Sequence, residues 1–152
     1  MTRANARELA VHLIYSCEFT GETPEETIAS RLDKAYYDLL AKENQVYTER
    51  PSRAQMAYLD TVVTGVVNRT DVLNEIIQKY AIDWDISRIS KLSRSIMQLA
   101  IFEALYVDDV PTGVAISEAV RIAKLYDSNE AGAFVNGILG SFARELPTEV
   151  SQ

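Results

Sequence analysis

Apolar residues recur at intervals of three and four along most of the 152-residue chain, and this spacing restricts the fold more than any other feature. Such a period gathers apolar side chains on one face of an α-helix. Between Ile96 and Tyr106 almost every residue is apolar, with Gln98 and Glu103 as interruptions. A helix of this composition is typical of the centre of a bundle. No stretch shows strand alternation of comparable quality, so the sequence predicts an all-α fold.

Capping residues and prolines divide the first half of the chain into predicted helices. The first has its apolar stripe within residues 6–17, and Thr23 followed by a proline opens a second that continues toward Leu40. The polar stretch 42–52 predicts one long exposed loop. A third helix over 56–80 contains weak helix formers near its middle, which predict a bend or a break there.

Three more helices are predicted in the second half, which brings the total to about six to seven. The fourth begins near Asp85 or Ser87, and the fifth covers 112–126. The last begins with Asp127 and Glu130, which have the three-residue spacing of a capping box. Gly137 and Gly140 lie inside this last helix, where each costs about 1 kcal/mol relative to alanine. We therefore expect a close backbone approach to a neighbouring helix at these two glycines.

Charge and cysteine content exclude several classes of protein. The chain has 22 Asp and Glu against 15 Lys and Arg, a net charge of -7, so an indiscriminate polyanion binder is disfavoured. A single cysteine, Cys17, excludes an intramolecular disulfide and cysteine-based zinc fingers. The N-terminal residues lack the apolar stretch of a signal peptide, and no apolar run is long enough for a membrane span. We expect a cytoplasmic protein that is not associated with a membrane.

The sequence offers few candidates for catalysis. His12, the only histidine, falls outside the first apolar stripe, and Cys17 lies on it, so neither is expected to be catalytic. Phosphate-binding glycine loops, hydrolase motifs and metal-ligand clusters are absent from the sequence, which predicts no enzyme, no cofactor and no metal. Glu103 and Glu118 are candidates for an acid pair, but a carboxylate in an apolar helix more often has a structural role. Trp84 is a candidate for stacking on a base, although packing is the commoner role.

Basic residues are unevenly distributed. The stretch 86–102 contains three basic residues and no acidic one. Together with basic residues of other helices, they are candidates for a discontinuous basic surface, whose members are Arg3, Arg7, Arg88, Lys91, Arg94, Arg121 and Lys124. Separate solvated helix faces explain the same residues without a ligand, and composition favours that simpler interpretation.

Several short motifs occur in an order that resembles the NusB family of transcription antitermination factors. The first helix contains RANARELA at 3–10 and LIY at 13–15, Gly65 and Val66 follow, and WDISRI at 84–89 is similar to the family's W-x-[LI]-x-R-[LI] pattern. The strongest part comprises VPTGVAISEAV at 110–120, AKLY at 123–126 and FVNGIL at 134–139. These are similar to the family's VPxxVAINEA, AKxY/F and FVNGxL series. The ordered set, with matching gaps, spans nearly the whole chain.

The resemblance implies a NusB-like fold of two small packed helical bundles. Residues 1–152 would form a single RNA-binding domain, with an N-terminal half at about 1–81 and a C-terminal half at about 82–146. It also implies a non-catalytic factor that binds single-stranded boxA RNA of ribosomal RNA transcripts as a heterodimer with NusE, a small-subunit ribosomal protein. This heterodimer would join RNA polymerase together with NusA and NusG.

The same resemblance implies RNA-binding positions in both halves. Two arginines match basic positions of the family's first helix, where they would contact phosphate. Two tyrosines match aromatic positions near the RNA or partner surface, where stacking on an unpaired base is physically reasonable, although the first could simply pack. A further basic position and an acidic position at the start of the last helix also match. The six residues are Arg3, Arg7, Tyr15, Arg94, Tyr126 and Glu130.

Departures from the family pattern predict weaker RNA binding. Ala4 and Asn5 leave two arginines where the family often has a denser cluster, and Gln98 and Ser117 replace a frequent Arg and the usual Asn. We expect weak, salt-sensitive binding that needs NusE. Two alternatives remain: a protein-interaction module with little or no RNA binding, and a homodimer that covers the RNA-binding face. The NusB-like domain of RNA cytosine methyltransferases is a less favoured alternative, since 152 residues leave no room for their separate cofactor-binding domain.

Overall fold

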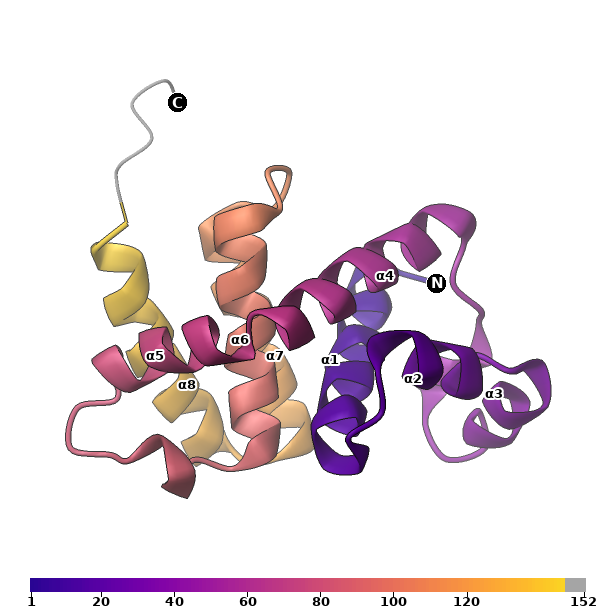
Figure 1. Cartoon of the computed structure of the whole chain (residues 1–152), viewed down its shortest axis with the longest axis horizontal. Coiled ribbons are helices and arrows are strands. Elements are labelled where there is room, and N and C mark those ends of the chain that lie inside the picture. The colour runs from indigo at the N-terminus through magenta and orange to yellow at the C-terminus, as the bar shows by residue number, and fades with distance from the viewer. Residues whose placement is uncertain (147–152) are drawn as a thin grey trace. The chain divides into compact units, whose positions relative to one another are not determined.

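The structure, a computed structural model, describes residues 1–146, which form eight α-helices and two short 3₁₀ helices without any strand (Figure 1). The all-α prediction is confirmed, and the number of helices slightly exceeds the six to seven expected. The chain divides into two compact units, which meet between Thr70 and Asp71.

The first unit, Met1–Thr70, is organised around its first helix. This helix, α1 (Arg3–Thr20), packs against α2 (Pro24–Arg31), α4 (Arg53–Asn68) and the 3₁₀ helix η1 (Gln45–Thr48), while α3 (Lys34–Leu40) packs against α2 and η1. The core includes apolar residues of α1 and α4 that are at most 2% exposed, among them Leu9, Leu13, Ile14, Leu59, Val62 and Val63. Burial of each such side chain contributes roughly 1.5–3 kcal/mol.

Polar side chains define where these helices begin. Thr2 accepts a hydrogen bond from the Asn5 backbone N–H at 3.0 Å at the start of α1. The predicted start of α2 is confirmed, because Thr23 and Glu26 form a capping box. Ser52 and Gln55 form a second box at the start of α4. These bonds satisfy N–H groups that a helix leaves unpaired in its first turn.

Two predictions for the first unit are wrong. The second helix does not continue to Leu40, because Asp33 caps a new helix by accepting a bond from the Tyr36 backbone N–H. The stretch 42–52 is not one exposed loop, since η1 lies within it and its Val46 and Tyr47 are 1% and 4% exposed. An apolar pair in a polar stretch is too short for any periodicity to show, so its burial depends on contacts with α1 and α3.

The second unit begins at Asp71 and has the apolar run of the sequence at its centre. It contains α5 (Thr70–Tyr80), the 3₁₀ helix η2 (Ile86–Arg88), α6 (Lys91–Tyr106), α7 (Thr112–Tyr126) and α8 (Asn129–Arg144). α6 packs against both α7 and α8, which also pack against each other. Every residue of α6 from Ser95 to Glu103 is buried, which agrees with the prediction of a central helix.

Helix α5 is joined to the rest of the second unit by side chains. The Tyr80 ring packs edge to face on Phe142 of α8, with 6.2 Å between the ring centres. Asn74 accepts a hydrogen bond from the Gln98 side chain of α6 at 2.8 Å. The expected interruption of the third helix is confirmed, because α4 ends at Asn68 and α5 begins at Thr70.

The starts of α6 and α8 differ from the prediction. α6 begins at Lys91 rather than near Asp85 or Ser87, because the preceding residues form η2 and Ser90 is the cap. α8 is capped by Ser128, which accepts a bond from the Ala131 backbone N–H at 3.0 Å, and not by Asp127. Asp127 instead ends α7.

The expected close approach at two glycines of α8 is also wrong. A β-carbon added at Gly137 would meet nothing within 4 Å, and one at Gly140 would lie at an ordinary 3.6 Å from the Arg144 side chain. The close approach occurs at Gly132, where an added β-carbon would lie 2.5 Å from Cγ of Lys124 on α7. The neighbour of each glycine depends on helix packing, which local sequence does not specify.

Candidate functional site

Three of the six predicted RNA-binding residues lie on α1 in the first unit. Arg3 is exposed in the first turn, whereas Arg7, one turn later, is 8% exposed. Residues four apart lie on one face of a helix, so the two arginines are neighbours along α1. Tyr15 is half-buried and stacks on Phe19, with 6.1 Å between the ring centres. Arg3 therefore presents its charge to solvent more openly than Arg7.

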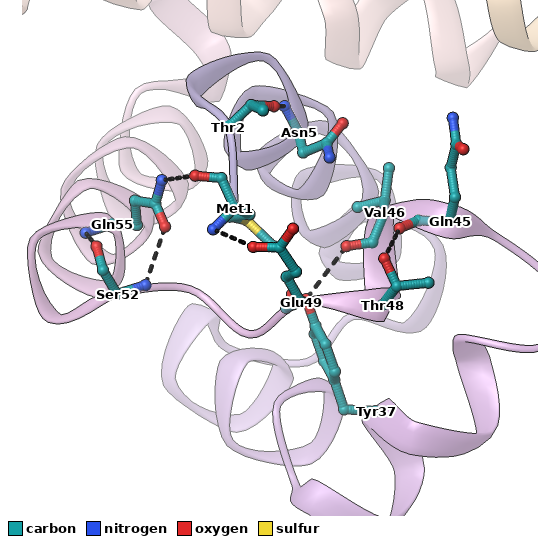
Figure 2. Close-up of polar contacts among 10 residues, drawn as sticks. All are labelled: Met1, Thr2, Asn5, Tyr37, Gln45, Val46, Thr48, Glu49, Ser52 and Gln55. Carbon is teal, nitrogen blue, oxygen red and sulfur yellow. Dashed lines mark hydrogen bonds and ion pairs between the residues drawn. The ribbon is translucent and has the colours of Figure 1, made fainter.

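A network around the chain start holds the end of α1 that carries Arg3 (Figure 2). The Met1 ammonium pairs with the Glu49 carboxylate at 3.2 Å. The Gln55 side chain donates to the Met1 carbonyl at 2.6 Å and accepts from the Ser52 backbone N–H at 2.9 Å. The residues after η1 and the first turn of α4 thus hold the start of α1 from two sides.

His12 belongs to an aromatic cluster in the first unit. Its Nδ1 lies 2.7 Å from the Tyr47 hydroxyl, and the two rings stack with centres 5.7 Å apart. Burial lowers the pKa of His12 to about 4, with a further lowering by the charge of Arg31. Tyr37 packs edge to face on Tyr47, and burial raises the pKa of Tyr37 to about 12. These contacts attach η1 to α1 and give His12 a structural role.

The other three predicted residues lie in the second unit. Arg94 is half-buried in the first turn of α6, and Tyr126 is the half-buried last residue of α7. Glu130 is exposed in the first turn of α8. The link between α7 and α8 is short, so Tyr126 at the end of α7 and Glu130 at the start of α8 lie near each other. Both belong to the second unit, whereas the α1 residues belong to the first.

A pocket of about 500 Å³ in the second unit includes Glu130 in its lining. It combines two aromatic rings, three serine hydroxyls, two carboxylates and one guanidinium, contributed by Trp84, Phe134, Ser90, Ser93, Ser128, Asp127, Glu130 and Arg88. Trp84 packs edge to face on Phe134 with 5.7 Å between ring centres, yet remains 52% exposed. We call this group of residues the Trp84 pocket.

The Trp84 pocket shows which site residues sequence reasoning missed. The sequence favours a packing role for Trp84, and Trp84 does contact Phe134, but half of its surface is open to solvent. Phe134 is the first residue of the FVNGIL motif, and nothing in the sequence marks Ser93 as functional. The available signal was the pair of capping serines, Ser90 and Ser128, which mark helix starts that the fold brings to one place.

Other candidates from the sequence have ordinary structural partners. Glu118 and Arg121 form an ion pair at 2.6 Å within α7, so this carboxylate is engaged by a cation. Burial raises the pKa of the Cys17 thiol, which disfavours the reactive thiolate. Residues 1–146 contain no group of three or more His, Cys, Asp or Glu arranged to hold a metal. Among the helices of these residues, none has the length and apolar content needed to cross a membrane.

Comparison with known proteins decides the family. The sequence model of the NusB family matches residues 4–144. The chain belongs to the NusB family. It is 36% identical over 152 residues to the transcription antitermination protein NusB of Ruminiclostridium cellulolyticum, covering 99% of this chain and 95% of that protein.

Solved structures of NusB proteins have the same fold. T. maritima NusB superposes with a TM-score of 0.76 and 28% identity, covering 95% of this chain and 93% of that chain. A chain in the complex of antitermination factors NusB and NusE with dsRNA gives a TM-score of 0.74 at 22% identity, covering 95% of this chain and 97% of that chain. The NusB fold expected from the ordered motifs is confirmed.

Proposed function

We propose that this chain is a non-catalytic, cytoplasmic antitermination factor that binds boxA RNA of ribosomal RNA transcripts as a heterodimer with NusE. In this proposal the heterodimer joins RNA polymerase together with NusA and NusG. Family membership supports the antitermination role, and the solved complex of NusB and NusE with RNA supports the two partners. The observation that carries RNA binding on this chain is the Trp84 pocket, which combines an exposed aromatic surface with polar groups around it.

The chemistry of the Trp84 pocket suits an unpaired base better than a phosphate group. Aromatic side chains stack on bases of single-stranded RNA. The carboxylates of Asp127 and Glu130 repel phosphate but accept hydrogen bonds from exocyclic amino groups of bases. Arg88, at the same pocket, supplies a cation for the neighbouring backbone phosphate. In this proposal Glu130, which matches an acidic position of the family, accepts a hydrogen bond from the amino group of a base.

The remaining predicted residues are proposed to position the RNA. Arg3, Arg7 and Arg94 would contact phosphate, and Tyr15 and Tyr126 would stack on bases. With a net charge of -7 and few cations at these positions, the chain provides little electrostatic affinity for RNA. NusE would supply additional contacts, so binding by the two proteins together is proposed to be cooperative.

One observation favours the alternative of a protein-interaction module with little RNA binding. Arg7 is 8% exposed, so its guanidinium is poorly placed for a phosphate. A second alternative is a homodimer that covers the RNA-binding face, and it predicts that the protein is a dimer in solution.

A titration of fluorescent single-stranded boxA RNA tests the proposal. The protein is added with and without NusE, at two salt concentrations, beside a scrambled RNA. We expect tighter, sequence-dependent binding with NusE, whereas NusE binding without RNA preference would establish the interaction module. Failure to bind either partner would reject the proposed function, and size-exclusion chromatography with light scattering identifies a homodimer.

Charge variants locate the phosphate contacts in the same assay. Each phosphate contact on a single strand contributes about -0.7 to the slope of log affinity against log salt, so Arg3→Met should reduce the slope by about this amount. Lys42→Met removes the same charge from an exposed side chain outside the predicted site and serves as the control. Equal slopes for Arg3→Met and the wild type would exclude Arg3 from the interface.

A further inference from the structure

The backbone around Trp84 is held by one side chain of α5. The Gln78 carboxamide donates from Nε2 to the Trp84 carbonyl at 2.7 Å and accepts at Oε1 from the Ile86 backbone N–H at 2.8 Å. A single amide thus bonds to the residues on both sides of Asp85. The donor and acceptor of a glutamine side chain match a peptide backbone in this arrangement.

Other local bonds act on the same segment. The Trp84 backbone N–H donates to the Ala81 carbonyl at 3.1 Å, which closes a turn. Asp83, within that turn, has a φ of 69°, the left-handed region that few residues other than glycine adopt readily. Asp85 accepts from the Ser87 backbone N–H at 2.9 Å, and this bond lowers the pKa of Asp85. The backbone conformation that presents Trp84 is therefore specified at several consecutive residues.

These constraints do not bury the indole. Trp84 is 52% exposed, although Phe134 contacts it and an apolar side chain would gain by complete burial. No residue in the described part of the chain accepts a hydrogen bond from the indole N–H. A large aromatic surface is thus kept open at the edge of a pocket whose other groups suit a base.

We propose that Trp84 is the stacking platform for an unpaired RNA base, and that Gln78 is the positioning residue that holds the platform open. This inference rests on the proposed function and adds to it a residue that neither the motifs nor the charge pattern indicated. Gln78 lies on α5, outside the pocket lining, and acts through the backbone of Trp84. A fixed platform loses little conformational entropy on binding, which makes stacking more favourable.

Variants at both positions test the inference in the full chain together with NusE, with a labelled single-stranded boxA RNA as the probe. Trp84→Leu retains an apolar contact for Phe134 but removes the stacking surface. We expect its RNA affinity to fall roughly 5- to 150-fold, the range for stacking on one base. The platform would be rejected if the wild type binds this RNA and Trp84→Leu binds it equally well.

Gln78 variants keep the indole and alter only its support. Gln78→Met has a similar length and loses both hydrogen bonds, whereas Gln78→Glu keeps an acceptor for Ile86 and loses the donor to the Trp84 carbonyl. Gln45→Met is the matched control, because the exposed Gln45 side chain makes no hydrogen bond among the described residues. We expect about 3- to 10-fold weaker binding for Gln78→Met, at least as large a loss for Gln78→Glu, whose carboxylate faces the Trp84 carbonyl, and no change for Gln45→Met.

Fluorescence separates positioning from a purely structural role. Trp84 is the only tryptophan of the chain, so its emission reports on the platform directly. We expect RNA to quench this emission in the wild type and to quench it less in Gln78→Met at saturating RNA, with unchanged helix content. A lower melting temperature with unchanged quenching and affinity would overturn the role of Gln78. If Trp84→Leu does not fold, the emission of the wild type tests the stacking role of Trp84 instead. RNA binding without quenching of this emission would reject that role. A wild type that binds no RNA with NusE present rejects the proposed function itself.

Discussion

The low pKa of His12 predicts a specific dependence of stability on pH. In the folded protein, burial and the nearby Arg31 lower this pKa to about 4 from an ordinary value of 6.5. Protonation of His12 therefore favours the unfolded chain. The stabilising contribution of the neutral ring is fully present above pH 6.5 and is lost as the pH falls from about 6.5 to about 4.

The magnitude follows from the difference between the two pKa values. One pKa unit corresponds to about 1.4 kcal/mol, so complete protonation of His12 lowers the free energy of unfolding by about 3 kcal/mol. At pH 5 the unfolded chain is almost fully protonated at His12 and the folded chain is mostly neutral, so about 2 kcal/mol is already lost. This loss is a large fraction of the stability of a small domain.

Urea denaturation of the wild type and of His12→Phe, each at pH 7 and pH 5, measures the effect. Phenylalanine keeps a ring that can stack on Tyr47 but has no group that titrates. The variant loses the 2.7 Å contact with the Tyr47 hydroxyl, so its stability at pH 7 is expected to be lower. The decisive quantity is the change between the two pH values, which should be about 2 kcal/mol smaller in His12→Phe. An equal change in both proteins would refute the assigned environment of His12.

Two further predictions concern single contacts in the two units. Gln55→Glu keeps an acceptor for the capping box but loses the donor to Met1 and places a carboxylate against its carbonyl, so urea denaturation should show a loss of about 1–2 kcal/mol. No loss would mean that the contact with Met1 does not form in solution. Gly137→Ala has open space for its β-carbon and should stabilise α8 by about 0.5–1 kcal/mol in the same assay. Gly132→Ala gains the same propensity but must displace Lys124, so an equal gain would contradict the close packing there.

The helical character of the chain was predictable because it depends on local chemistry. The period of apolar residues, the capping box at Thr23 and the weak formers before Thr70 act within a few residues. Those signals placed α1, α4, α5 and α7 within a few residues of their observed bounds. The ordered motifs also predicted the family, because the order of the motifs and the spacing between them are more specific than the pattern of any single helix.

The predicted starts of α6 and α8 are wrong because several neighbouring residues are suitable caps. Both Asp127 and Ser128 are good helix caps, but the Asp127 backbone N–H bonds to the Ala123 carbonyl and ends α7, and Ser128 caps α8. Likewise α6 has three suitable caps near its start, Asp85, Ser87 and Ser90. Asp85 caps the 3₁₀ helix that contains Ser87, and Ser90 caps α6. Propensities of similar size cannot rank such alternatives, because tertiary contacts contribute more free energy than one cap.

The sequence by itself determined an all-helical chain, its helix-forming segments and its membership of the NusB family. The tertiary structure decided the candidate site, because the Trp84 pocket joins the stretch 84–93 to the stretch 127–134. It also decided that Trp84 remains half exposed, that Gln78 holds it, and that Gly132 rather than Gly137 meets a neighbouring side chain. These features depend on how separate helices and turns pack against one another, even where the partners are only six or eight residues apart, as Gln78 is from Trp84 and Ile86. The local pattern of apolar and polar residues does not specify that packing.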